Sequence, residues 1–163
     1  PEGERGSFTV RTDHKTFMAL AIEEALTGVQ AGEQPFGAVV VRDGEIVCRT
    51  HSTVNSTADP TAHAEMTAVR KAAGNLETPR LKGCTLYASC EPCAMCCGGI
   101  LFGGIDALVI GAPSDEQMRA FGRPKRDFTP ESLAEAMNME LEVIRGVLQN
   151  DAVNVFEVYK GRT

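Results

Sequence analysis

Residues 61–65 read Thr-Ala-His-Ala-Glu, and residues 90–96 read Cys-Glu-Pro-Cys-Ala-Met-Cys. The first stretch holds a histidine with a carboxylate two residues further on, and the second holds a Cys-x-x-Cys pair directly after a proline. One imidazole nitrogen and two thiolates are the three protein ligands of a catalytic zinc, whose fourth position stays open for water. These two stretches therefore predict both a metal centre and the pair of helices that carries it.

We expect His63, Cys93 and Cys96 to hold one zinc ion (Zn²⁺) per chain. The two cysteines fall on one face at the start of a predicted helix, where the peptide dipoles favour thiolates. Glu65 is then left to move protons between the activated water and the substrate. A Cys-x-x-Cys pair alone is also typical of a redox dithiol or of half a structural zinc site. Cys90 could close such a structural site as a fourth ligand, but we place it at a strand end, outside the metal shell.

Predicted strands and predicted helices alternate along the rest of the chain. Apolar and β-branched runs predict five strands, at residues 36–41, 46–50, 84–89, 107–111 and 140–144. Helical spacing and capping residues predict five helices, at residues 13–32, 61–74, 92–102, 131–138 and 151–160. Thr61 is expected to cap the second helix and Pro92 to open the third. This order predicts an α/β fold, a three-layer α/β/α sandwich with a central mixed five-stranded sheet.

Length and spacing predict a single domain over residues 13–163, preceded by a flexible tail at residues 1–12. Residues 51–60 are rich in turn-forming side chains and are expected to form a loop. Residues 113–130 contain several glycines and prolines that interrupt any periodicity, so they give no clear element.

Charge and cysteine content restrict the partners and the cellular compartment that the sequence predicts. The net charge of −6 makes a nucleic-acid partner unlikely, because phosphate contacts dominate such binding. Four basic residues gather in one segment, and we expect a solvated loop there: Arg119, Arg123, Lys125 and Arg126. No apolar run is long enough to span a membrane. The six cysteines fit a reducing cytoplasm better than a disulfide scaffold, with Cys48 and Cys84 in the core.

The pattern His-x-Glu followed by Pro-Cys-x-x-Cys resembles the zinc-dependent cytidine and nucleobase deaminase superfamily. Residues 35–41, 59–65 and 89–93 are most similar to guanine deaminases and to bacterial tRNA adenosine deaminases. The resemblance implies the cytidine deaminase fold, a homodimer, and an enzyme that releases ammonia through a zinc-activated hydroxide. In that reaction, the position matching Glu65 carries the protons.

The substrate implied by the resemblance is a free nucleobase or a related small aminated heterocycle, with a guanine-like purine favoured. A tRNA adenosine deaminase is the alternative enzyme, but residues 111–115 and the acidic charge depart from that group. An alternative of another class is a non-catalytic, zinc-stabilised binding module. That module would not need Glu65, so the presence of this carboxylate counts against it.

The resemblance also implies residues that bind the substrate. The backbone around Ala64 and the Ser89 carbonyl are expected to position the ring and its amine. Ser52 stands where most relatives carry an asparagine that reads the ring edge, and a hydroxyl does not offer the paired donor and acceptor of an amide. Recognition has therefore changed, or it has moved to Asn55.

Aromatic side chains give two further candidates. Phe36 packs against the ring or belongs to the core, and the sequence favours neither. Phe156 and Tyr159 lie in the last predicted helix, which often helps to close the pocket in relatives. Their spacing favours a place in the core instead.

Overall fold

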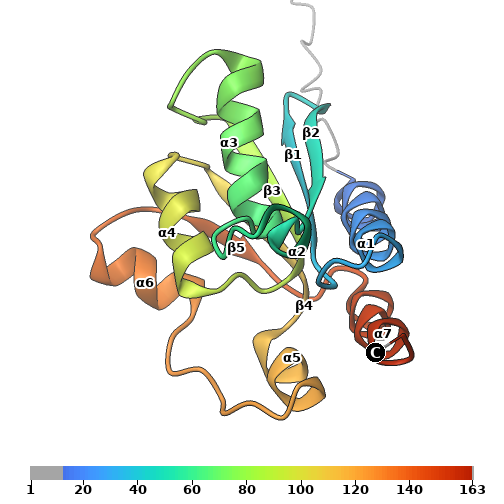
Figure 1. Cartoon of the computed structure of the whole chain (residues 1–163). Helices are drawn as coiled ribbons and strands as arrows, with labels where there is room; N and C mark the ends of the chain where they lie inside the picture. Colours follow the sequence, from blue (N-terminus) through green and yellow to red (C-terminus); the bar gives the residue numbers. More distant parts are fainter. Residues whose placement is uncertain (1–12, 163) are drawn as a thin grey trace, which may run out of the picture.

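The computed structural model describes residues 13–162 as one five-stranded sheet with helices on both faces (Figure 1). The strands are β1 (Gly37–Arg42), β2 (Glu45–His51), β3 (Cys84–Cys90), β4 (Ala107–Ala112) and β5 (Glu142–Ile144). Their order across the sheet is β2-β1-β3-β4-β5. The β1 strand is antiparallel to both β2 and β3, whereas β3, β4 and β5 run parallel. The predicted mixed sheet and the α/β/α layers are confirmed, and the expected tail at residues 1–12 lies outside the described residues.

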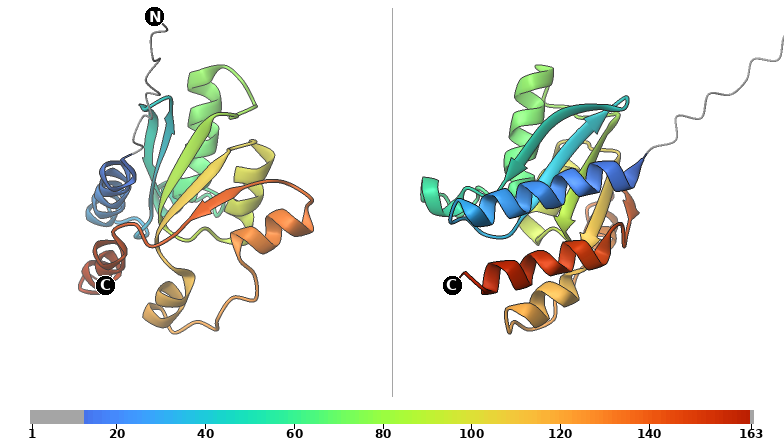
Figure 2. Two further views of the ribbon diagram at one scale, coloured as in Figure 1. Left: turned by 180° about the vertical axis from the view of Figure 1, so that it is seen from behind. Right: turned by 90° about the vertical axis from the view of Figure 1, so that its right-hand side faces the viewer.

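Two hydrophobic clusters fill the space between the layers. On one face, α1 (His14–Gln30) and α7 (Gln149–Lys160) lie side by side over the sheet (Figure 2). Their cluster includes Met18, Tyr87 and Phe156. On the other face, α3 (Ala64–Leu76) and α4 (Ala94–Phe102) pack on a second cluster, which contains Leu86 and Ile100. None of the helices described over residues 13–162 is both long and apolar enough to cross a membrane.

Three shorter helices complete the fold: α2 (Val54–Thr57), α5 (Ser114–Ala120) and α6 (Pro130–Ala136). Both α2 and α5 lie in segments without a helical signal in the sequence. The buried carboxylate of Glu33 accepts hydrogen bonds from the backbone N–H groups of Asn55 and Ser56, both at 2.9 Å, and so satisfies the free amino end of α2. These contacts join residues far apart in sequence, which explains why residues 51–60 read as a loop.

The helices that carry the metal-binding motifs begin later than expected. His63, not Thr61, is the N-cap of α3, and Cys93, not Pro92, is the N-cap of α4. The Thr61 hydroxyl instead donates to the Asp59 carboxylate at 2.7 Å, within the turn before the helix. The predictions for Thr61 and Pro92 were therefore wrong, because Thr61 is held in a turn before α3 and the extended backbone of Cys93 follows Pro92 before α4 begins.

Candidate active site

The ends of two helices bring the metal-binding motifs together. His63 and Cys93 each hold an extended backbone conformation directly before α3 and α4. Cys96 follows in the first turn of α4. Neither N-cap side chain makes a capping hydrogen bond, and the two side chains instead meet between the amino ends of α3 and α4. The helix dipoles in that space favour anionic groups.

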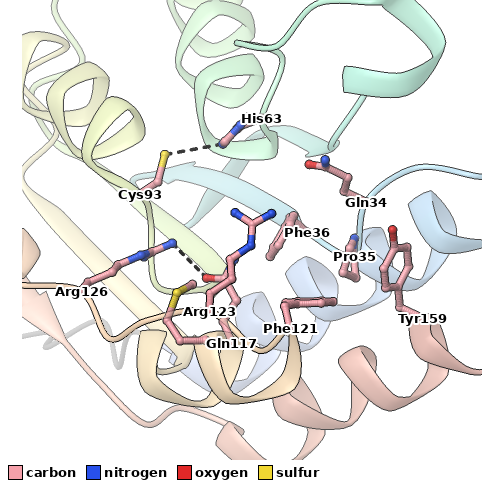
Figure 3. A pocket seen from close by; sticks show the side chains of 11 residues that line it. Gln34, Pro35, Phe36, His63, Cys93, Gln117, Phe121, Arg123, Arg126 and Tyr159 are labelled. Atoms are coloured by element: carbon pink, nitrogen blue, oxygen red, sulfur yellow. Dashed lines mark hydrogen bonds between the residues drawn. The ribbon is translucent and has the colours of Figure 1, made fainter.

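The three predicted ligands form a compact cluster. The ligand atoms of His63, Cys93 and Cys96 all lie within 4.8 Å of one another. The distance from the Cys93 Sγ to the His63 Nδ1 is 3.6 Å, and Figure 3 shows this contact at the edge of the cavity. A tetrahedral zinc with bonds of about 2.1–2.3 Å separates its ligand atoms by about 3.5–3.8 Å. The donor set and its spacing therefore fit a zinc ion held by three protein ligands.

The neighbouring cysteines point elsewhere. The Cys90 thiol donates to the Gln117 side-chain oxygen at 3.3 Å, and the Cys97 thiol donates to the Pro92 carbonyl at 3.6 Å. Cys48 and Cys84 are buried in the core, as predicted. Among residues 13–162, the cluster that could hold a metal contains neither Cys90 nor Cys97, so the structure supplies no fourth cysteine ligand.

The two thiols of the cluster shift the pKa values of each other in opposite directions. A hydrogen bond from Cys96 lowers the pKa of Cys93 to about 4, and His63 contributes to the same shift. The same hydrogen bond, together with burial, raises the pKa of Cys96 above its usual range. One thiolate is thus present before any cation is considered, and a divalent cation would favour the second.

Glu65 lies beside this cluster at the buried end of the site. It is the second residue of α3, and only 4% of its surface is exposed. Burial raises the pKa of its carboxyl group above the usual range. A carboxyl group with a raised pKa can both hold and release a proton near neutral pH, which is the property required of a general acid and base.

A cavity of about 360 Å³ opens onto the metal-ligand cluster (Figure 3). Its walls are formed by Gln34, Pro35, Phe36, His63, Cys93, Gln117, Met118, Phe121, Arg123, Arg126 and Tyr159. A smaller space of about 40 Å³ shares five of these residues and is also lined by Glu65 and Glu91. The cavity therefore leads from the surface, past the ligand cluster, to the buried carboxylate.

Of the six predicted substrate-binding residues, Phe36 lines both spaces. Neither space is lined by Ser52, Asn55, Ala64, Ser89 or Phe156. The Ser52 side chain is fully buried, and the Asn55 amide donates to the Gly32 carbonyl at 2.9 Å. The Ser89 hydroxyl accepts from the Gly37 N–H at 3.0 Å, and the Ala64 carbonyl accepts from Thr50 at 2.8 Å. Roles for these residues toward a substrate stay predictions.

The last helix divides its two aromatic side chains between core and cavity. Phe156 is 1% exposed and packs edge-on against Phe36 and Phe121, whose rings do face the cavity. Tyr159 lies at the cavity wall itself. The preference for a core position thus holds for Phe156, whereas Tyr159 belongs to the site.

The basic segment is the main part of the site that sequence reasoning missed. Arg123 and Arg126 line the cavity, and Arg126 donates to the carbonyls of Glu91 and Pro92, both at 3.2 Å. The segment around these two residues is a loop, as expected, and Arg123 is exposed, but Arg126 is only half-exposed and both side chains line the cavity, which the sequence did not predict. The clustering of basic residues was the available signal, but only the tertiary fold turns this segment back over the motif that holds Cys93.

Arg145 also holds the residues just before Cys93, through the side chain of Glu91. Glu91 is 5% exposed, and its carboxylate accepts from the Arg145 guanidinium at 2.6 Å. Arg145 also binds the Glu131 carboxylate through two hydrogen bonds, at 2.7 and 3.0 Å. These contacts connect α6 and the segment after β5 to residues 91–92, just before Cys93. This ligand loop is therefore held by both Arg126 and Arg145.

Comparison with known proteins agrees with this geometry. The family model for the cytidine and deoxycytidylate deaminase zinc-binding region matches residues 11–112. Guanine deaminase from Bacillus subtilis (strain 168) is 44% identical over 109 residues, which are 66% of this chain and 70% of the relative. The tRNA-specific adenosine deaminase of the same strain is 33% identical over 148 residues, covering 91% and 89% of the two chains.

A solved structure shows the same fold. Guanine deaminase from Nitrosomonas europaea superposes with a TM-score of 0.78 at 26% identity, covering 90% of this chain and 84% of that chain. The chain belongs to the cytidine and deoxycytidylate deaminase family, whose zinc-binding region it carries. It is a hydrolytic deaminase with zinc as its cofactor.

Proposed function

We propose that this enzyme deaminates a free nucleobase or a related small aminated heterocycle, with a guanine-like purine favoured. The observation that supports this most directly is the cavity of about 360 Å³, which leads to the ligand cluster and Glu65. Small-molecule sites occupy about 300–1,000 Å³, so this one suits a single ring system with few substituents. Its walls combine the aromatic rings of Phe36, Phe121 and Tyr159 with amide and guanidinium groups, which suit a flat polar ring.

His63, Cys93 and Cys96 would hold the zinc, which supplies an activated water when bound. Glu65 accepts the proton of that water and delivers protons to a ring nitrogen and to the departing amine. Phe36 supports one face of the ring. The N–H of Ala64 has no acceptor within α3, because it is the first residue of the helix, and it remains a candidate to bind the ring.

Ammonia release from the zinc-loaded protein tests this proposal. The panel contains guanine, guanosine, adenine, cytosine, isocytosine, aminated triazines and pterins, and Glu65→Gln is the control. We expect at least one small heterocycle to release ammonia in a reaction that depends on Glu65. No release from the whole panel, with one zinc bound per chain, would contradict a small-molecule substrate.

A tRNA adenosine deaminase is the second candidate, supported by the 33% identity over 148 residues to such an enzyme. The net charge of −6 weighs against it, and Arg123 and Arg126 face the cavity. An electrophoretic shift with tRNA, measured at increasing salt, separates the two candidates. A polynucleotide substrate requires binding that weakens as salt rises.

We also propose that the enzyme is a homodimer in a reducing cytoplasm. Phe102 on α4 is 75% exposed and Met95 is 36% exposed, so this helix presents apolar side chains that a second copy would cover. All six cysteines are free, which suits a reducing compartment. Light scattering of the wild type and of Phe102→Lys tests the dimer, since the substitution should shift the mass toward the monomer.

A further inference from the structure

The outer part of the cavity wall carries positive charge without a carboxylate partner. Within residues 13–162, the Arg123 side chain makes no ion pair or hydrogen bond, and its guanidinium points into the cavity (Figure 3). Within the same residues, the Arg126 guanidinium donates hydrogen bonds to neutral oxygens, namely two backbone carbonyls and the Gln117 amide at 3.0 Å, and it lies 5.6 Å from the centre of the Phe128 ring. Two guanidinium groups therefore face the same small space in a chain of net charge −6.

Three acidic groups near the arginine pair are already engaged, whereas Asp127 is exposed and lines neither space, and Glu65 lines only the smaller inner one. Glu91 pairs with Arg145 at 2.6 Å, behind the ligand loop. On α5, Glu116 pairs with Arg119 at 2.7 Å, and Asp115 pairs with Lys125 at 3.4 Å. The charge of a bound zinc would be balanced by the two thiolates. The positive charge of the arginine pair is thus left for the molecule that enters the cavity.

We propose that the substrate is an aminated heterocycle carrying an anionic oxygen group, either a carboxylate or a phosphate, which Arg123 and Arg126 bind. This inference rests on the proposed function, and it deepens it by naming the substrate class. The amino group lies at the end lined by His63 and Glu65, and the anionic group lies against the segment that follows α5. Guanidinium groups suit such an anion because their planar forks donate parallel hydrogen bonds to two oxygens.

The size of the site and the net charge of the chain restrict where the anion comes from. A cavity of about 360 Å³ accommodates a ring with a compact substituent. A polynucleotide would instead bring many phosphates against a surface whose net charge is −6. A small acid is therefore favoured over the phosphate backbone of a nucleic acid.

Matched substrate pairs test the proposal. Pterin is compared with pterin-6-carboxylate, and guanosine is compared with guanosine 5′-monophosphate, so that each pair differs by one anionic group. We expect kcat/KM to be about tenfold higher for the anionic member of at least one pair, the value typical of one charge-assisted hydrogen bond. Whichever pair responds identifies the anion as carboxylate or phosphate.

The variant Arg123→Gln removes the unpartnered charge, and it should bring the anionic-to-neutral ratio of kcat/KM close to one. The matched control Arg119→Gln lies on α5 outside the cavity and should leave the ratio unchanged. A thermal shift provides a second readout: the anionic member should raise the Tm of the wild type more than that of Arg123→Gln.

Two kinds of failure are distinguishable. If neutral heterocycles are deaminated in a Glu65-dependent reaction but the ratio is one and insensitive to Arg123→Gln, this inference is wrong while the proposed function stands. If no small molecule reacts and an anticodon stem-loop RNA does, both are wrong.

Discussion

The two walls of the cavity are built in contrasting ways. The metal-binding wall comes from residues 63–65 and 93–96, which lie at the amino ends of two helices, each with one face packed on the sheet. The opposite wall comes from α5, the connection after it and Tyr159, and it contains exposed side chains such as Arg123. In the proposed reaction, the first wall supplies the groups for chemistry and the second supplies the groups for recognition.

The contrast between the two walls implies that the reaction type and the substrate preference depend on different parts of the molecule. The ligand geometry requires atoms placed within a few tenths of an ångström, so it is held by two helices packed on the sheet and by the Glu91–Arg145 pair. Recognition requires only a suitable side chain at the wall, and a surface segment supports such changes without disturbing the core. We therefore expect substitutions in the two walls to affect different observables.

Loss of a metal ligand should have the largest effect. Cys96→Ala should reduce bound zinc to near zero and ammonia release to background, because two ligands hold the ion poorly. The matched control is Cys97→Ala, which removes a buried thiol that binds the Pro92 carbonyl instead. Metal analysis of both variants checks the prediction, and zinc loss from Cys97→Ala would show that the ligand set is assigned incorrectly.

Glu65→Gln should have the next largest effect. The amide has the same shape as the carboxyl group but cannot carry the proton, so kcat should fall by about 10²- to 10⁴-fold. Bound zinc should stay at one ion per chain, because Glu65 is outside the ligand cluster. Steady-state kinetics with metal analysis tests this, and unchanged kcat with zinc retained would exclude Glu65 as the proton carrier.

Arg145→Met tests the support that Glu91 and the metal-binding wall receive from Arg145. It leaves the buried Glu91 carboxylate without its partner, which should lower the free energy of unfolding by about 2 kcal/mol. This is less than for a fully buried pair, because the Arg145 side chain is 39% exposed and solvent screens its charge. Arg119→Met breaks an exposed pair and should cost under about 0.5 kcal/mol. Urea unfolding compares them, and equal costs would mean that Glu91 does not depend on Arg145.

Asn55→Ala should have the smallest effect. Its amide binds the Gly32 carbonyl and does not line the cavity, so KM should change by less than about threefold. Initial-rate measurements on the best substrate of the panel provide the test. A tenfold rise in KM would instead support the sequence-based assignment of Asn55 to the ring edge, and it would require this loop to move over the cavity.

Most of the fold was predictable because its signals are local. The five strands occur within two residues of their predicted ends, since apolar runs and the turn at residues 42–45 specify them. The α2 helix was missed because it depends on the Glu33 carboxylate, which arrives from the end of α1. The α5 helix was missed because its 7 residues are too few to show a period before Gly122 and Pro124.

By itself, the sequence predicted the metal-ligand cluster and the neighbouring carboxylate, because His63, Glu65, Cys93 and Cys96 stand in short motifs at predicted helix starts. Tertiary structure alone decided which residues form the opposite wall of the cavity. It buried Phe156 and placed Tyr159, Arg126 and the exposed Arg123 at the wall of the cavity. The physical reason is that the relative positions of the residues in a ligand motif depend on their spacing along one or two turns of a helix. A cavity wall, in contrast, depends on how distant segments pack against each other.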